Sequence, residues 1–405
     1  MADEQGNVHL NTTSSGVSPA ARGQAPKVVL NGVDVVGQLS SMARQTQALQ
    51  RYCALRPHAV DTTSIAGLTG TRKWQGGVLV PRNNSNTGST TNSGTAGTTS
   101  RSGHGTIYAI PNLADQVLII DTRTRTVDTT SITGINAVVG PVGGGKWTGG
   151  VLARNGLIYC TPTGAAAVLI INPTTNTIDL TSIANLPSVP NKWVKGALLP
   201  NGLIYAPPAD VDSMLIIDPQ SNTADLTSIS SLPSGEKKWT DIVLAGNGML
   251  YCIPGAATSV LIVDPSTNAF NHTTIGGFST TIWKWVGGVL AGNGKVYGIP
   301  YNHRGVLVID PATNTADTTA LGTHAGMLPL WAGGVLSEDK STIYGVPFSS
   351  TSVLLIDTLR NTTDTTTLAG LSDQEWKWSF GVLAGNTVFG IPFQADHALI
   401  IPSLC

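Results

Sequence analysis

Short apolar runs recur along the chain, and each one ends in Asp or Asn followed by polar turn residues. Six of them read VLIID, VLIIN, MLIID, VLIVD, VLVID and VLLID, at residues 117–121, 168–172, 214–218, 260–264, 306–310 and 353–357. A run of four apolar residues without alternation predicts a strand that is buried on both faces. We therefore expect the chain to build the same buried strand many times.

A tryptophan followed by a Gly-Gly-Val-Leu type of run marks each copy of a longer repeat. It occurs at Trp74, Trp147, Trp193, Trp239, Trp285, Trp331 and Trp378. Five of the six spacings are 46 or 47 residues, and the first is 73 because a low-complexity insert interrupts it. A period near 45 residues is typical of the blades of a β-propeller.

The copy at residues 284–321 divides at its turn residues into four strands. Asn293 and Gly294 form the dipeptide that most strongly predicts a hairpin turn. The expected strands are residues 285–290, 295–299, 306–310 and 315–321. Crowding around an axis explains the glycine pairs of the innermost strand, and a solvent-facing edge explains the threonines of the outermost one.

The two ends of the repeat region complement each other. The seventh copy stops after its third strand, at residues 398–402, whereas residues 60–65 read VDTTSI, which is a fourth-strand sequence. We expect this N-terminal strand to complete the last blade, so that the ring has no free edge. The predicted fold is an all-β, seven-bladed β-propeller of four-stranded antiparallel blades at residues 57–405, preceded by a short N-terminal helix.

The repeat also resembles known families. The stretches VLIINPTTNTIDLTSI (168–183) and VLVIDPATNTADTTAL (306–321) resemble the YVTN type of β-propeller repeat, and the blade plan is similar to kelch, NHL and WD40 propellers. The chain departs from their signatures: it has no Gly-His and Trp-Asp pair, no paired kelch glycines, and a longer repeat than YVTN. The resemblance implies a fold and a binding role, and it carries over no active site.

Three segments lie outside the blades. Residues 1–27 are polar and predict a flexible arm, and residues 82–105 are rich in Asn, Ser, Thr and Gly and predict a disordered loop insert. Residues 28–56 are interpreted as a helical stalk, with residues 33–55 as the helix. Its seam has spacings of four and three residues, at Val35, Leu39, Met42, Thr46, Leu49 and Cys53.

The stalk has two interpretations. The seam is about three heptads long, so the helix either pairs with copies of itself and makes a homo-oligomer, or packs its apolar stripe on the propeller. The segment VVLNGVDVV (28–36) resembles segments that introduce helices in structural proteins of large algal DNA viruses.

Composition excludes some functions. Charged residues are 12% of the chain and the net charge is −1, which argues against general nucleic-acid binding. We expect no membrane span, because no apolar stretch reaches about 18 residues. Residues 1–26 show no recognisable secretion signal, whereas low charge with many Thr, Ser, Gly and Asn is typical of exported or particle-surface β proteins. The localisation therefore stays open.

The chemistry-bearing residues show no convergent catalytic or metal-binding pattern. The histidines occupy unrelated repeat positions, and no His-X-X-X-His or Cys-X-X-Cys spacing occurs; they are His9, His58, His104, His272, His303, His324 and His397. Most aspartates recur in every copy, as turn formers do. We therefore expect no enzyme activity, no metal site and no cofactor.

A lysine directly precedes the repeat tryptophan in six copies, and Leu330 replaces it in the other. The six are Lys73, Lys146, Lys192, Lys238, Lys284 and Lys377. Because equivalent repeat positions are related by rotation, we expect a lysine ring at one mouth of the central channel, able to bind an anionic ligand. The alternative is that each lysine packs over its own tryptophan and pairs with a local carboxylate.

Loops on one face of the ring differ between copies that otherwise agree. Two residues before each tryptophan stand Arg72, Gly145, Asn191, Lys237, Trp283, Pro329 and Trp376. The loop after the second strand also differs, and in one copy it contains His303 and Arg304. Trp283 and Trp376 are either exposed platforms for a glycan or a protein partner, or covers for blade edges.

Cys53 and Cys405 are candidates for a disulfide. The chain enters the last blade near residue 60, antiparallel to the strand that precedes Cys405, which brings the two ends together. The missing secretion signal and the place of Cys53 in the seam argue against the bond. Cys160 and Cys252 share one repeat position and are expected to be buried and free.

These observations predict a non-enzymatic structural or adhesive binding protein that displays a recognition face, as part of a larger assembly or virion. The alternative is a carbohydrate-binding lectin or a glycan-processing propeller enzyme.

Overall fold

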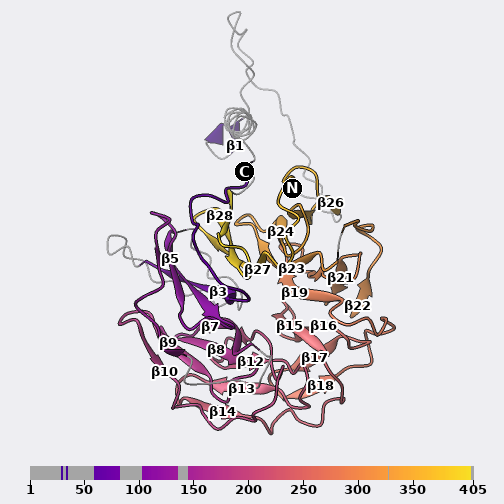
Figure 1. Cartoon of the computed structure of the whole chain (residues 1–405). Helices are drawn as coiled ribbons and strands as arrows, with labels where there is room; N and C mark the ends of the chain where they lie inside the picture. Colours follow the sequence, from indigo (N-terminus) through magenta and orange to yellow (C-terminus); the bar gives the residue numbers. More distant parts are fainter. Residues whose placement is uncertain are drawn as a thin grey trace, which may run out of the picture. The chain divides into compact units, whose positions relative to one another are not determined.

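The computed structural model describes residues 59–82, 103–135, 145–326 and 328–402, with two short strands near the N-terminus. The chain divides into two units, and His58–Ser403 is the larger. In this unit seven antiparallel sheets surround one axis (Figure 1). Six sheets have four strands and the last has three. The seven-bladed propeller predicted from the sequence is confirmed.

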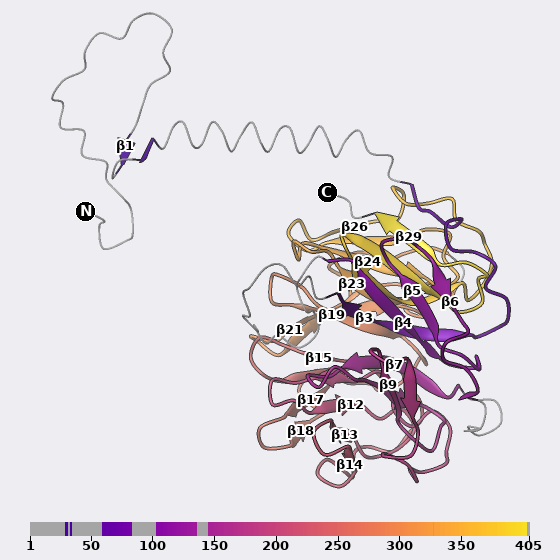
Figure 2. The same ribbon diagram turned by 90° about the vertical axis from the view of Figure 1, so that its left-hand side faces the viewer.

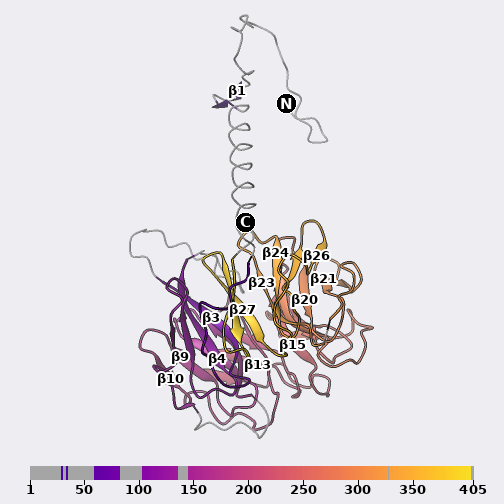
Figure 3. The same cartoon turned by 45° about the horizontal axis from the view of Figure 1, so that its top comes forward.

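Each blade begins with an innermost strand that contacts the innermost strands of neighbouring blades, and the last of these contacts the first. Figure 3 shows the first blade, in purple, beside the last, in yellow. The innermost strands are β3 (Trp74–Pro81), β7 (Trp147–Leu152), β11 (Ala197–Leu198), β15 (Trp239–Leu244), β19 (Trp285–Leu290), β23 (Trp331–Leu336) and β27 (Trp378–Ala384).

The second and third strands are the buried middle of each blade. The second strands are β4 (Gly105–Pro111), β8 (Ile158–Pro162), β12 (Ile204–Ala206), β16 (Leu250–Pro254), β20 (Val296–Pro300), β24 (Thr342–Pro347) and β28 (Thr387–Pro392). The third strands are β5 (Leu118–Asp121), β9 (Leu169–Asn172), β13 (Leu215–Asp218), β17 (Leu261–Asp264), β21 (Leu307–Asp310), β25 (Leu354–Asp357) and β29 (Leu399–Pro402). Blades 1 to 7 are numbered in this order.

The outer strands are shorter than predicted. They are β6 (Val127–Asp128), β10 (Thr177–Asp179), β14 (Thr223–Asp225), β18 (Ala269–Asn271), β22 (Thr315–Asp317) and β26 (Thr362–Asp364). We predicted a strand at residues 315–321, but β22 ends at Asp317. Its Oδ1 accepts the backbone N–H groups of Thr319 (2.7 Å) and Ala320 (3.0 Å), which turns the chain. The recurring aspartates are thus turn formers, as expected.

The hydrophobic core lies between blades. One cluster joins Tyr297 and Ile299 of blade 5 to Trp331, Ile343 and Leu354 of blade 6, and all five side chains are buried. Because both faces of the middle strands pack on a neighbouring blade, no alternation of polar residues is tolerated there. This explains the continuous apolar runs of the third strands.

Glycine at the axis is required by close approach of the innermost strands. At Gly287, where φ is 98°, an added Cβ would lie 2.6 Å from the Cα of Gly333 in the next blade. Real Cβ atoms do not approach backbone so closely, and the positive φ also favours glycine. The expected crowding at the axis is confirmed.

The N-terminal segment closes the ring at blade 7. Asp61 and Ile400 exchange two backbone hydrogen bonds of 2.9 Å, and the N–H of Ala398 donates to the carbonyl of Ile65 (3.0 Å). Figure 2 shows the indigo N-terminal segment of the propeller beside yellow β29. The predicted closure is confirmed, although the pairing is a single bridge rather than a strand over residues 60–65.

A tyrosine of the second strand ties its blade to the next one at the outer side. The hydroxyl of Tyr159 donates to Oδ1 of Asn222 (2.5 Å), and Tyr251 and Asn314 repeat the contact two blades later (2.6 Å). Asn222 has φ of 53°, in the left-handed region, which Asn tolerates better than most residues. The Asn of the turn is therefore selected both for its backbone and for its side chain.

The N-terminal unit contains a strand pair. β1 (Val29–Leu30) pairs with β2 (Val33–Asp34), so the helix predicted from residue 33 is wrong at its first two residues. The sequence Asn31-Gly32 between them favours a hairpin. The rest of the predicted stalk and arm, most of the loop insert, and Cys53 and Cys405 lie outside the described residues. The predicted self-association and disulfide stay predictions.

Two further expectations concern the described part of the chain. Cys160 and Cys252 are buried and free, as predicted. No helix in that part is long and apolar enough to cross a membrane.

Substitution of Asn222 separates its two contributions. Asn222→Gly and Asn222→Ala both lose the bond from Tyr159, but alanine must also adopt the left-handed backbone. We expect Asn222→Ala to lower the free energy of unfolding by about 1 kcal/mol more than Asn222→Gly, measured by urea denaturation. Equal stabilities would contradict the role assigned to the backbone.

The turn aspartates predict acid sensitivity. Hydrogen bonds from Ser131 and Thr130 lower the pKa of Asp128 to about 2, and those from Ser182 and Thr181 lower the pKa of Asp179 to about 2. Their stabilisation is complete above the unfolded pKa of about 3.9 and is lost as the pH falls through about 2. The melting temperature should therefore fall between pH 4 and pH 2.

The corresponding residue of blade 4 suggests a control variant. Blade 4 has Asn271 at this position, and its Oδ1 accepts the N–H groups of Thr273 and Thr274. Asp179→Asn should keep the turn and show a smaller fall in melting temperature between pH 4 and pH 2. A fall as steep as that of the unsubstituted protein would show that other groups control acid unfolding.

Candidate functional site

The six repeat lysines are buried, with at most 6% of each exposed. Lys192 is typical: its Nζ lies 5.8 Å from the ring centre of Trp193 and donates to the carbonyls of Ala165 (2.9 Å), Val189 (3.3 Å) and Thr163 (3.5 Å). Ala165 and Thr163 belong to the loop of the preceding blade. The lysine therefore joins two blades through backbone carbonyls.

This placement corrects the prediction of a lysine ring at one mouth of the central channel. The ammonium groups face carbonyls between the blades, and burial lowers the pKa of Lys192 to about 8. The arrangement matches the alternative in which each lysine packs over its own tryptophan, except that carbonyls are the main partners; Lys146 also lies 3.9 Å from Asp115. Lys73 makes the same contact across the ring closure, to the carbonyl of Ala395 (2.9 Å).

Three blades break the pattern at the axis. Two residues after the tryptophan, blades 1, 2, 5 and 6 have glycine, whereas blades 3, 4 and 7 have Lys195, Asp241 and Phe380. We call these three residues the axial trio. The predictions from the sequence did not include the trio, because they rested on His and Cys spacings and on the glycine pairs of the other blades. The missing glycines were the signal that would have found it.

Asp241 is the buried member of the trio, with 2% of its surface exposed. Its Oδ1 accepts the N–H of Ile242 and its Oδ2 accepts the N–H of Gly288, both at 2.9 Å. Burial raises the pKa of Asp241, and the positive charge of Lys195 opposes this rise. The carboxyl group is thus held rigidly, with its charge coupled to that of a neighbouring lysine.

Lys195 and Phe380 are in contact with each other across the axis. The Nζ of Lys195 lies 5.8 Å from the ring centre of Phe380, a cation–π distance. Phe380 has φ of 60°, a left-handed conformation that costs a bulky residue about 1–3 kcal/mol. Such strain persists only where the surrounding structure enforces it, and it is concentrated at functional sites.

Five aromatic side chains gather next to the trio, and we call them the aromatic arc. They are Trp283, Tyr301, Phe348, Trp376 and Phe393. Phe348 is central, with ring-centre distances of 5.2 Å to Tyr301, 5.6 Å to Phe393 and 6.1 Å to Trp376. Phe380 packs in the same cluster, which joins the arc to the trio.

The arc carries a cation at one end. The guanidinium carbon of Arg72 lies 6.0 Å from the ring centre of Phe393. Burial raises the pKa of Tyr301, and the charge of Arg72 opposes this. Trp376 is 37% exposed and Trp283 is half-buried against the arc. That these two tryptophans bind a ligand stays a prediction.

His303 and Arg304 are engaged in their own loop. The ring of His303 lies 4.7 Å from that of Trp285, and its Nδ1 is 3.0 Å from the carbonyl oxygen of Gly305. Arg304 donates to the carbonyl of His324 (2.9 Å). These contacts fix the loop to the linker that follows the blade.

Blades 1 and 2 present a polar arc on the same face. Nδ2 of Asn112 donates to Oε1 of Gln75 (2.9 Å), Thr148 donates to the same oxygen (3.4 Å), and Thr163 donates to the hydroxyl of Thr148 (2.7 Å). Oδ1 of Asn112 is buried and has no hydrogen-bond partner. The face thus has an aromatic sector and a polar sector, with the trio at the axis.

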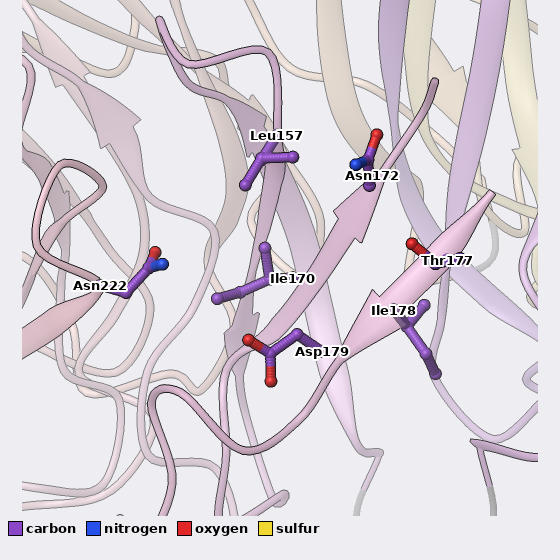
Figure 4. Close-up of a pocket in the computed structure, with 7 residues that line it drawn as sticks. All are labelled: Leu157, Ile170, Asn172, Thr177, Ile178, Asp179 and Asn222. Atoms are coloured by element: carbon purple, nitrogen blue, oxygen red, sulfur yellow. The ribbon is translucent and has the colours of Figure 1, made fainter. Parts of the chain in front are cut away.

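Other candidate sites carry less chemistry. A pocket of about 180 Å³ lies at the outer strands of blade 2, and Leu157, Ile170, Asp179 and Asn222 are among the residues that line it (Figure 4). The carboxylate of Asp179 already accepts hydrogen bonds from Thr181 and Ser182 in its own turn. In the described ranges no group of three or more His, Cys, Asp or Glu side chains is placed to hold a metal ion.

Comparison with known proteins identifies the fold. No family model and no curated protein matches the chain. The structure of virginiamycin B lyase from Staphylococcus aureus superposes with a TM-score of 0.60 at 10% identity, over 85% of this chain and 98% of the lyase. A chain of the mitotic checkpoint complex superposes with a TM-score of 0.55 at 10% identity, over 97% and 99%. At these identities the likeness shows the propeller fold alone.

These comparisons correct the function predicted from the sequence. Three of the similar structures are of one enzyme, virginiamycin or streptogramin B lyase, and none of the comparisons supports a structural or adhesive role. The propeller fold is therefore compatible with catalysis. The findings favour the alternative over the structural or adhesive prediction.

Removal of one buried lysine tests its role between blades. Lys192→Met leaves three carbonyls without their donor, and we expect it to lower the free energy of unfolding by about 2 kcal/mol. Lys295→Met is the control, because its side chain is 43% exposed and its Nζ pairs with Asp310 at 3.5 Å. That change should cost about 0.5 kcal/mol or less. Equal effects in urea denaturation would contradict the role assigned to Lys192.

Proposed function

We propose that the protein is a glycan-processing propeller enzyme that binds a carboxylated sugar on the aromatic arc and transfers a proton at the axial trio. The replacement of three axial glycines by Lys195, Asp241 and Phe380 is the observation that carries the proposal. Close approach of the innermost strands favours glycine at this position. Three larger side chains at one place therefore indicate a functional role rather than a role in blade packing.

The arc suits a sugar that bears a negative charge. Aromatic faces bind the apolar face of a sugar ring, and Trp376 is the exposed member of the arc. The guanidinium of Arg72 offers the paired donors that a carboxylate accepts. The polar arc lies on the same face, where the partly exposed Gln75 and Thr163 offer an amide and a hydroxyl group to the sugar hydroxyls.

In the trio the partly exposed Lys195 is the group that would touch the ligand, and Asp241 is its buried counter-charge. A lysine that touches the reacting group can act as a general acid or base. Asp241 acts through Lys195 and is a positioning residue. Proton transfer of this kind is what hydrolysis or elimination at a glycosidic bond requires.

Binding is tested by tryptophan fluorescence with D-glucuronate and D-galacturonate, with D-glucose for comparison. Arg72→Ala should weaken binding of the acids at least tenfold, since a charged hydrogen bond contributes about 1.5–3 kcal/mol. Lys237→Ala is the matched control, because Lys237 has the same repeat position in blade 4 and pairs with Glu236. Failure of both acids to bind the unsubstituted protein would refute the proposal.

Turnover is tested with uronate-containing oligosaccharides. Lys195→Gly restores the residue that the repeat itself uses, so it should fold and bind while losing turnover at least 100-fold. Asp241→Asn should shift the pH profile of turnover, which a purely structural role would not do. Binding without any turnover in the unsubstituted protein would establish a lectin instead of an enzyme.

A further inference from the structure

Blade 6 carries a second candidate site beside its tryptophan. A pocket of about 330 Å³ lies against Trp331. Gly326 lies in the linker before the blade, Ser350 and Ser352 in the loop between β24 and β25, and Asp373 in the linker that follows. This volume is in the range of small-ligand sites. Nothing in the proposed chemistry at the axis uses this pocket.

Blade 6 is also the blade without the repeat lysine. In blade 5, Nζ of Lys284 lies over the repeat tryptophan and donates to the carbonyls of Gly255 (2.6 Å) and Ala257 (2.9 Å). Leu330 occupies this position in blade 6, and its side chain has neither a charge nor a hydrogen-bond donor. The pocket therefore lies beside the repeat tryptophan that no lysine covers.

Two buried hydroxyl groups form one wall of the pocket. Ser350 and Ser352 are each 7% exposed, and their Oγ atoms are 3.4 Å apart. The N–H of Ser350 donates to the carbonyl of Leu330 (3.2 Å), and that of Ser352 to Oγ of Ser350 (3.3 Å), which holds the loop in place. The position of Ser350 is occupied in the other blades by Ala114, Ala165, Val211, Ala257, His303 and Ala395.

A second polar substitution packs against Trp331. His324 is 8% exposed, its ring packs edge-on against Trp331 at 5.4 Å, and its Nε2 is buried without a hydrogen-bond partner. The other six blades have an apolar residue here, namely Leu68, Ile135, Leu186, Leu232, Phe278 and Leu371. Burial lowers the pKa of His324, which disfavours a positive charge on the ring.

The lining specifies the kind of ligand. Serine and threonine hydroxyls donate and accept hydrogen bonds, and the carboxylate of Asp373 accepts them from hydroxyl groups. No lysine or arginine is among the residues that line the pocket, and the carboxylate of Asp373 would repel a negatively charged ligand. We propose that the pocket of blade 6 binds one neutral sugar unit through Ser350, Ser352 and Asp373. The axial site, for which we propose a carboxylated sugar, shares none of these three residues.

Saturation-transfer NMR on the full chain tests the proposal, with D-glucose, D-galactose, D-mannose and N-acetyl-D-glucosamine as probes. We expect transfer to at least one of them. Ser350→Leu fills the pocket and should abolish the signal, and Asp373→Asn should weaken binding at least fivefold. Thr258→Ala changes the corresponding loop of blade 4 and should have no effect.

The axial site supplies the second control. Arg72→Ala should leave the neutral-sugar signal unchanged, while it weakens uronate binding if the axial proposal holds. No transfer to any of the four neutral sugars, or a signal that survives both Ser350→Leu and Asp373→Asn, would overturn the proposal. Loss of the signal in Arg72→Ala would also overturn it, because the sugar would then bind at the axis. If Ser350→Leu does not fold, the exposed Asp373→Asn decides.

Discussion

Close approach of seven innermost strands around one axis is the constraint on which the rest of the structure depends. It leaves no room for a Cβ at Gly287 or Gly333 and forces a positive φ there. Each residue larger than glycine at this position therefore has to be accommodated. Phe380 has the left-handed backbone that the glycines have at this position in other blades. The axis therefore departs from the repeat at the cost of backbone strain.

The ring is held together by buried contacts that cross from blade to blade. Apolar clusters span neighbouring blades, Lys192 reaches the carbonyls of the preceding blade, and Tyr159 reaches the turn of the next. Because these contacts repeat, the stability of one blade depends on both neighbours. A single blade can then lack one of these contacts and still be held by its neighbours. Blade 6 is an example, because Leu330 replaces its repeat lysine.

Repetition explains which predictions from the sequence succeeded. The period, the apolar runs and the glycine pairs predicted the propeller, because each position experiences the same packing in every copy. The interpretation of the lysines failed because rotation places equivalent residues on a ring without specifying whether they face the axis or a neighbouring blade. Lys192 has carbonyls within reach between blades, and its hydrogen bonds to them are formed instead of contacts with solvent.

The sequence by itself determined the number of blades, the closure by the N-terminal segment and the roles of the turn aspartates, since these follow from local patterns and their period. Only the tertiary structure decided which departures from the repeat meet. The axial trio comes from blades 3, 4 and 7. Phe380 is far from Lys195 and Asp241 in the sequence, and closure of the ring brings all three residues to one axis. The period predicts that blades 5, 6 and 7 are neighbours, but only the structure shows that Phe348 contacts Tyr301, Phe393 and Trp376 there.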